Sequence, residues 1–318
     1  MGELRKTYYD KNMENVAWII PTHRSRFQIY VRHYTLTKKY AQDFKHFAVV
    51  QSTQEAIELR QLTDDTLEII NLEEYFSKLQ ILTYTKTNSI INVKKLFGLL
   101  QIYKNFDKVI ITDDEIQLFD VLTPNDILEI ENNSHVFHRI INKNTIRIIS
   151  SPIRLLDDSN EKSLIYDFFC VNDAYGWFAN LPVYKSKYLP SFFARYKLND
   201  TQDFDKITFQ DFDFILYQYS LYLDDREHIK FKIYNWNLPD LGGSLWEMYY
   251  INSIYFKFIE EDRKKNKILW IPNIKCKEIV PDAKMVFNID RDYSIQKLTF
   301  KRLIKKIRIE LNIANKDN

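Results

Sequence analysis

The chain has 318 residues, 45% of them hydrophobic and 28% charged, which is a globular composition long enough to bury a substantial core. A formal net charge of +2 is too small to indicate nucleic-acid binding by bulk electrostatics. The two cysteines, Cys170 and Cys276, lie far apart without metal-site spacing, which excludes a disulfide framework and is typical of a reducing compartment.

Residues 16–120 alternate between strand-like and helix-like segments, the pattern of an α/β sheet flanked by helices. An apolar strand at 16–20 ends at Pro21, and a polar turn leads into a helix that begins near residue 27. The further predicted segments are strands at 47–50 and 67–70, a helix at 90–103 and a strand at 109–111.

The turn after the first strand contains Pro21, Thr22 and Arg24. A polar turn in this position can place backbone groups and an arginine against a nucleotide. Thr22 can equally well cap the helix that follows, as threonine often does. The residues alone leave both interpretations open.

Three consecutive acids, at 113–115, follow the strand at 109–111. Carboxylates at the carboxyl end of a buried strand can hold a hard divalent cation. Alternate residues point the same way as a strand ends, so Asp113 and Glu115 are predicted to face one cation, while the direction of Asp114 stays undetermined. A solvated turn is the alternative. The strand before the acids, and Lys94 and Lys95 in the preceding helix near the expected phosphate path, favour the cation site.

Residues 121–240 show a looser pattern, with strands expected at 145–149 and 231–234 between irregular loops. After them, Gly243 would allow close backbone approach to a ligand, Trp246 could stack on a sugar, and Glu247 could accept a proton as a general base. A helix that begins here with a favourable acid in its first turn is the alternative. Asp173 is a second candidate for the base.

The C-terminal segment 291–318 has apolar residues at helical spacing among many lysines and arginines. A basic amphipathic helix of this kind can lie on an anionic membrane surface, or it can pack on the core with a solvated basic face. No signal peptide and no run of about 18 apolar residues is visible. We therefore expect a cytoplasmic protein, with peripheral contact at the inner membrane face as one option for this helix.

The chain contains five glycines and neither a G-x-G-x-x-G nor a Walker A motif, so a dinucleotide fingerprint and a P-loop are excluded. No G-x-S-x-G elbow occurs. The spaced pair His135 and His138 is interpreted as structural.

Three short elements, in their order along the chain, resemble glycosyltransferases of the GT-A type, and in particular the glycosyltransferase-like proteins of bacterial surface-polysaccharide clusters. Residues 19–24 resemble the opening strand and nucleotide-contacting turn of that family, and 109–115 its D-x-D motif. Residues 243–249 resemble a late glycine-then-acid element on the acceptor side. The likeness covers mainly 16–120 and the segment around 247. One departure is that Glu115 stands where the motif has aspartate.

The resemblance implies a single domain over 1–318, with a GT-A-like nucleotide-sugar-binding half at 16–120 and a decorated acceptor-side half at 121–290. It implies transfer of a sugar from a nucleotide-diphosphate donor to a bacterial surface glycan of capsule or lipooligosaccharide, without nucleic acid as a partner. The implied roles are metal binding of Mn²⁺ or Mg²⁺ by Asp113 and Glu115, donor binding by Pro21, Thr22, Arg24, Lys94, Asp113 and Asp114, acceptor binding by Gly243 and Trp246, and base catalysis by Glu247 or Asp173.

Two other functions remain open from the sequence. The many aromatic residues, 15% of the chain, suit a non-catalytic carbohydrate-binding protein. The same carboxylates could instead activate water in a metal-dependent hydrolase of phosphorylated sugars.

Overall fold

The computed structural model describes residues 15–114, 116–118, 121–123, 127, 134–139, 150–170, 174–176, 182–227, 231–236, 268–271 and 285–288. The candidates Glu115, Asp173, Gly243, Trp246 and Glu247, together with the segment 291–318, lie outside the described residues.

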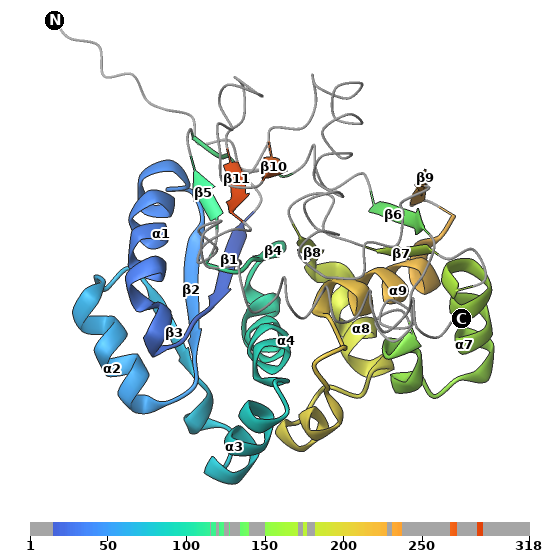
Figure 1. The fold of residues 1–318 in the computed structure, drawn as a ribbon, viewed down its shortest axis with the longest axis horizontal. Coiled ribbons are helices and arrows are strands. Elements are labelled where there is room, and N and C mark those ends of the chain that lie inside the picture. The colour runs from blue at the N-terminus through green and yellow to red at the C-terminus, as the bar shows by residue number, and fades with distance from the viewer. Residues whose placement is uncertain are drawn as a thin grey trace, which may run out of the picture.

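A five-stranded sheet in the order β3-β2-β1-β4-β8 forms the centre of the fold (Figure 1). Its strands are β1 (Val16–Pro21), β2 (Lys45–Val50), β3 (Glu68–Asn71), β4 (Lys108–Ile111) and β8 (Val183–Lys185). The first four run parallel, and β8 pairs antiparallel with β4. The predicted α/β class, with a sheet flanked by helices, is confirmed.

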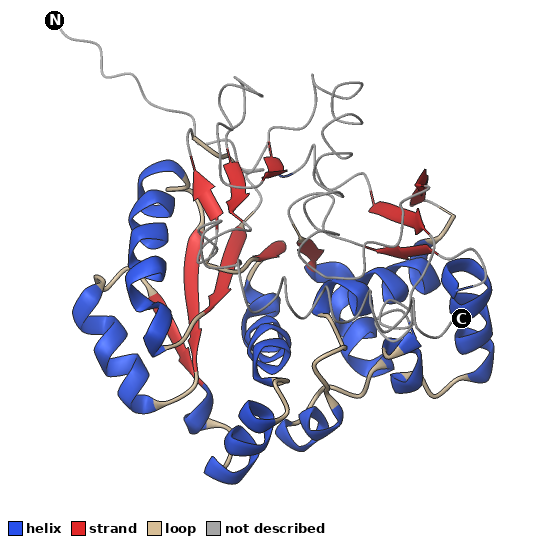
Figure 2. Cartoon of the chain, viewed as in Figure 1, coloured by secondary structure: helices blue, strands red, loops and turns tan. Residues whose placement is uncertain are grey.

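Helices cover both faces of this sheet (Figure 2). One face packs against α1 (Phe27–Tyr40) and α2 (Thr53–Leu62). The helices on the other face are α3 (Lys78–Lys86), α4 (Ile90–Ile102), α8 (Leu189–Arg195) and α9 (Asp213–Asp225), and α7 (Ser159–Ile165) packs against α9. Of these, the sequence pattern predicted α1 and α4.

The residues of β1 divide between the two faces by strict alternation. Ala17 and Ile19 belong to the core shared with α4, whereas Trp18 and Ile20 belong to the core shared with α1. A parallel strand that is buried on both sides needs apolar residues at every position, because each neighbour points to a different core. This explains why 16–20 forms a continuous apolar run.

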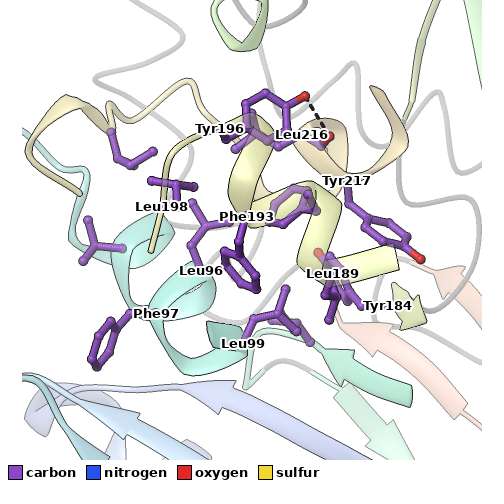
Figure 3. Close-up of a cluster of buried hydrophobic side chains, with 14 of the residues drawn as sticks. Leu96, Phe97, Leu99, Tyr184, Leu189, Phe193, Tyr196, Leu198, Leu216 and Tyr217 are labelled. Atoms are coloured by element: carbon purple, nitrogen blue, oxygen red, sulfur yellow. Dashed lines mark hydrogen bonds between the residues drawn. The ribbon is translucent and has the colours of Figure 1, made fainter. Parts of the chain in front are cut away.

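The second half of the chain completes the core on the α4 face. Figure 3 shows Leu96 and Leu99 of α4 close to Leu189 and Phe193 of α8. Tyr196 donates a hydrogen bond to the carbonyl of Leu216 in α9 at 3.0 Å, which ties α8 to α9 within this cluster.

Two small sheets accompany the central one, in the orders β10-β11-β5 and β7-β6-β9. Their strands are β5 (Ile116–Leu118), β6 (Ser134–Arg139), β7 (Ala174–Gly176), β9 (Phe231–Trp236), β10 (Ile268–Ile271) and β11 (Met285–Asn288). The strand predicted at 231–234 is confirmed within β9, and the one at 145–149 lies outside the described residues. Among the helices that the structure describes, none is long and apolar enough to cross a membrane.

Candidate functional site

The strand order reverses between β1 and β4. From β1 the chain adds β2 and β3 on one side and then returns to place β4 on the other side. In open α/β sheets, ligands bind beyond the carboxyl ends of the strands at such a switch point. Hydrogen bonds from Thr22 N to Val49 O (3.0 Å) and from Thr112 N to Ile19 O (3.1 Å) continue the ladder to this edge.

Asp114 is held on the α1 side of the edge. Its side chain is 2% exposed and forms an ion pair with Arg26 that engages both carboxylate oxygens, with Nε 2.7 Å from Oδ2. The Thr22 hydroxyl donates to the same Oδ2 at 3.4 Å. Burial raises the pKa of Asp114, and the hydrogen bonds and charge of Arg26 oppose that shift. Asp114 therefore fixes the turn after β1 in place.

Asp113 turns to the α4 side and stays 45% exposed. Lys95, whose side chain is 8% exposed, places its Nζ 3.0 Å from Asp113 Oδ1 and 3.8 Å from Asp213 Oδ1. Burial lowers the pKa of Lys95, but the charges of Asp113 and Asp213 outweigh burial and raise it overall. A permanently charged ammonium thus lies between two carboxylates at the end of β4.

Asp213 is the first residue of α9 and is 1% exposed. Its Oδ2 accepts a hydrogen bond from the hydroxyl of Tyr184 in β8. Burial and the charge of Asp213 raise the pKa of Tyr184 well above its ordinary value, so the phenol remains a donor. The second half of the chain thereby contributes a buried carboxylate beneath the edge.

Lys94 lies under the turn after β1 and is 3% exposed. Its Nζ donates to the carbonyl of Thr22 at 2.6 Å. Burial lowers the pKa of Lys94 to about 8, while the charges of Glu55 and Asp114 raise it by a smaller amount. Lys94 is therefore at the predicted edge, where it supports the backbone of the turn, and Lys95 is the lysine that reaches Asp113.

Arg24 points away from this cluster to α2. Its Nε and Nη2 lie 2.6 and 2.7 Å from the carboxylate oxygens of Glu58. Glu55, also in α2, accepts from the backbone amides of Arg24 at 3.0 Å and of Gln51 at 2.8 Å. The carboxylate of Glu55 thus joins the turns that follow β1 and β2. Pro21 ends β1 as the sequence predicts.

Thr22 does not cap the following helix. The chain first forms a 3₁₀ turn, Arg24–Arg26, whose N-cap residue is His23, and α1 begins at Phe27. Burial and the charges of Lys94 and Arg26 lower the pKa of His23. The Thr22 hydroxyl faces Asp114 instead, so the cap interpretation is wrong, and contact of Thr22 with a nucleotide stays a prediction.

A buried tryptophan, Trp18, is hydrogen-bonded to the first residue after β4. Trp18 is fully buried, and its Nε1 donates to the hydroxyl of Thr112 at 2.8 Å. Thr112 precedes Asp113, so this bond fixes the backbone from which the acidic residues leave β4.

The sequence interpretation missed Arg26 and Asp213 as members of this cluster. Arg26 lies in the polar turn that the sequence singled out, and helical structure from Arg24 onward turns Arg26, not Arg24, to the edge. Asp213 is 100 residues from Asp113 in the sequence and has no local signal. Its place depends on the tertiary packing of α9 against α4.

Of the acidic run at 113–115, the structure describes Asp113 and Asp114. Among all the described residues, no group of three His, Cys, Asp or Glu side chains could enclose a metal ion. Asp114 does not fit as a ligand because Arg26 engages its carboxylate oxygens. Asp113 fits, since it is half-exposed at the end of β4. One carboxylate suffices where substrate phosphates and water complete the shell of Mg²⁺.

No protein-family model matches this chain, and no curated protein sequence matches it. Among solved structures, the chain is similar to the mannosyltransferase Ktr4p from S. cerevisiae in complex with GDP, with 8% identity, coverage of 69% of each chain and a TM-score of 0.38. It is similar to the galactosyltransferase LgtC in complex with donor and acceptor sugar analogues, with 11% identity, coverage of 42% of this chain and 51% of that one, and a TM-score of 0.25.

A third similar structure is 4-diphosphocytidyl-2C-methyl-D-erythritol synthase from Anaerococcus prevotii, with 12% identity, coverage of 76% of this chain and 96% of that one, and a TM-score of 0.32. All three similarities are remote in sequence and in superposed structure.

Proposed function

We propose that this chain is a glycosyltransferase that binds the diphosphate of a nucleotide-sugar donor at the carboxyl edge between β1 and β4. The observation that supports the proposal most directly is the gathering of charge at the strand-order switch. The ion pair of Lys95 and Asp113 lies at this edge, beside the turn after β1 that the ion pair of Arg26 and Asp114 stabilises. In α/β sheets, this is the position where nucleotide ligands bind.

The charges at the edge suit a diphosphate leaving group. Negative charge develops on the leaving diphosphate as the sugar is transferred, and positive groups in a low-dielectric site stabilise that charge. Lys95 lies in such a site, shielded from water and paired with a carboxylate. Backbone groups of the turn after β1 have a fixed direction because Lys94 and Asp114 hold the turn from below.

A divalent cation is part of the proposal, with Asp113 as its ligand in the described part of the chain and Glu115 as the second ligand that the sequence predicts. Mn²⁺ or Mg²⁺ would neutralise charge on the diphosphate when bound. The acceptor is proposed to be a bacterial surface glycan. Gly243 and Trp246 are proposed to contact it, and Glu247 or Asp173 to deprotonate its hydroxyl if the reaction inverts configuration.

The experiment is a thermal-shift screen of UDP, GDP and CDP with and without Mn²⁺, followed by a nucleotide-release assay with the matching sugar donors. A ligand that binds the folded state alone raises the apparent melting temperature. We expect a metal-dependent shift for one nucleotide. We also expect Asp113→Ala to lower nucleotide release at least about a hundredfold while the melting temperature without ligand is retained.

Asp107→Ala is the matched control, because Asp107 lies at the opposite end of β4, where it accepts a hydrogen bond from the backbone of Asn15. Wild-type nucleotide release by Asp113→Ala would rule out the proposed metal ligand. Nucleotide release that does not depend on a glycan acceptor would instead favour a hydrolase.

A further inference from the structure

One carboxylate oxygen of Asp213 is buried without a hydrogen bond from the described residues. Asp213 is 1% exposed, and its Oδ1 accepts no hydrogen bond from any residue that the structure describes. Buried carboxylate oxygens in folded proteins nearly always have a partner, so an exception calls for a physical reason. The Oδ2 atom of the same side chain is satisfied by the Tyr184 hydroxyl, which leaves Oδ1 directed to Lys95.

The nearest cation to this oxygen is already engaged. Lys95 Nζ lies 3.0 Å from Asp113 Oδ1 but 3.8 Å from Asp213 Oδ1, so the ammonium makes a hydrogen-bonded pair with the first carboxylate and a longer ion pair with the second. A lysine ammonium is a compact charge on a flexible stem with three rotatable donors. A small change in the Lys95 side chain would exchange the near and the distant partner.

We propose that Lys95 is a movable counter-ion which passes from Asp113 to Asp213 when a divalent cation engages Asp113. This inference rests on the proposed function of the edge. Asp213 is then a positioning residue that acts through Lys95, since it receives an ammonium that a cation bound to Asp113 would repel.

The charges balance in both arrangements. Without the cation, Lys95 neutralises exposed Asp113 at hydrogen-bonding distance and buried Asp213 at longer range. With the cation on Asp113, the cation neutralises that carboxylate. The ammonium of Lys95 then moves to hydrogen-bonding distance of Asp213 and neutralises the buried carboxylate. Removing the partner of a buried charge is strongly unfavourable, which is why the lysine needs this second acceptor.

A purely structural role for Asp213 predicts different behaviour. An acid in the first turn of α9 is stabilised by the helix dipole and by Tyr184, whatever happens at Asp113. In that case, the effect of replacing Asp213 on cation binding would not depend on Lys95. The two possibilities can therefore be separated by a double-mutant cycle.

The cycle uses the full chain, Asp213→Asn and Lys95→Met, with Mn²⁺ affinity measured by electron paramagnetic resonance in the presence of UDP or GDP. We expect Asp213→Asn to weaken Mn²⁺ binding about tenfold, in line with the loss of groups that orient metal ligands. In the Lys95→Met background, we expect the same substitution to change the affinity by less than about twofold. Equal losses in both backgrounds would overturn the inference.

Asp211→Asn is the control for general damage. Asp211 is also fully buried and lies two residues from Asp213, but its carboxylate accepts hydrogen bonds from Ser151, Arg154 and Thr208. Asp211→Asn should leave Mn²⁺ affinity unchanged. A loss equal to that of Asp213→Asn would count against the inference.

A second measurement does not depend on the folding of Lys95→Met. Lysines labelled with ¹³C at Cε are followed by nuclear magnetic resonance, and Lys95→Arg identifies the Lys95 signal. We expect Mg²⁺ with the nucleotide to shift this signal in the wild-type chain and to leave it unmoved in Asp213→Asn. A signal unmoved in the wild type although Mg²⁺ binds would refute the movement of Lys95. Absence of any cation binding by the wild type would instead remove the proposed metal site, and the inference with it.

Discussion

At the scale of the residue, two neighbouring aspartates of one acidic run have different environments. Asp114 points to the α1 side, where Arg26 holds it in a buried pair, and Asp113 points to the α4 side, where it is half-exposed beside Lys95. The division follows from the alternation of side chains as the chain leaves β4. One carboxylate therefore maintains the shape of the turn, and the other is available to a ligand.

Lys94 provides a pH test at this scale. Burial is the largest cause that lowers its pKa, to about 8, from an ordinary value of 10.5. Between these pH values the unfolded chain binds more protons than the folded one, so the free energy of unfolding rises with pH. The cost of burying the ammonium is fully present below about pH 8 and disappears as the pH approaches 10.5.

We expect the free energy of unfolding of the wild type to increase by ~2 kcal/mol relative to that of Lys94→Met between about pH 7.5 and pH 10. Urea denaturation of both proteins across this range measures the difference, and comparing the two cancels the titration of other groups. Parallel pH curves would show that Lys94 titrates near its ordinary value.

At the scale of the element, α4 is the helix that brings both lysines to the edge. It lies unusually close to the sheet: a Cβ added to Gly98 would be 2.8 Å from Val49 Cγ2 and 3.4 Å from Ile19 Cγ2. Lys94 is one turn before Gly98 on the same side of the helix. The absence of a side chain at Gly98 thus allows Lys94 to reach the carbonyl of Thr22.

Gly98→Ala should destabilise the protein by about 1–3 kcal/mol, because overpacking a tight core forces side chains or backbone to move. A loss of stability would be the opposite of the usual effect, since alanine in place of glycine normally stabilises a helix interior by about 1 kcal/mol. Urea denaturation measures the change. In a Val49→Ala background, which removes the clashing methyl group, the penalty of Gly98→Ala should mostly vanish, and an undiminished penalty would locate the strain elsewhere.

At the scale of the molecule, two cores lie on opposite faces of one sheet and are built from different parts of the chain. The core with α1 and α2 comes mainly from residues before 128, with Val183 of β8 added. The core with α4 also needs α8, α9 and β8. The two halves of the sequence therefore share a sheet and a core, and the candidate site contains residues of both.

A fragment that ends at residue 123 should not fold cooperatively. It retains four of the five central strands but loses the helices that cover Leu96 and Leu99, so an apolar face would be exposed to water. Urea denaturation followed by far-ultraviolet circular dichroism should show no sigmoidal transition. A cooperative transition of the fragment would show that the first half is an independent folding unit.

The sequence predicts those features that depend on local pattern. The strands at 16–20, 47–50, 67–70 and 109–111 and the helix at 90–103 are confirmed within a residue or two, because a buried parallel strand and a helix each have a characteristic spacing of apolar residues. The same spacing predicts that the acids at 113–115 come directly after a buried strand.

The remaining features depend on contacts between distant segments. Helices α7, α8 and α9 lie in the stretch expected to be mostly irregular. The aromatic residues Phe192 and Phe193 of α8 and Tyr217 and Tyr219 of α9 are buried in the core shared with α4, and α7 packs against α9. The spacing of apolar residues does not predict that Asp213 lies near Lys95 and Asp113. It also does not predict that Arg26, and not Arg24, lies at the edge. The roles of Glu115, Asp173, Gly243, Trp246 and Glu247 stay predictions.

The hydrogen bond between Trp18 and Thr112 gives the edge a fluorophore of its own. The indole is shielded from water, and its Nε1 donates to the hydroxyl of Thr112, the residue before Asp113. The emission of Trp18 therefore depends on the position of this hydroxyl dipole, which moves with the backbone at the end of β4. Any ligand that moves this backbone acts on the indole through a single bond. Because the chain has five tryptophans, the part of the emission that a Trp18→Phe variant lacks is the signal for occupancy of the edge.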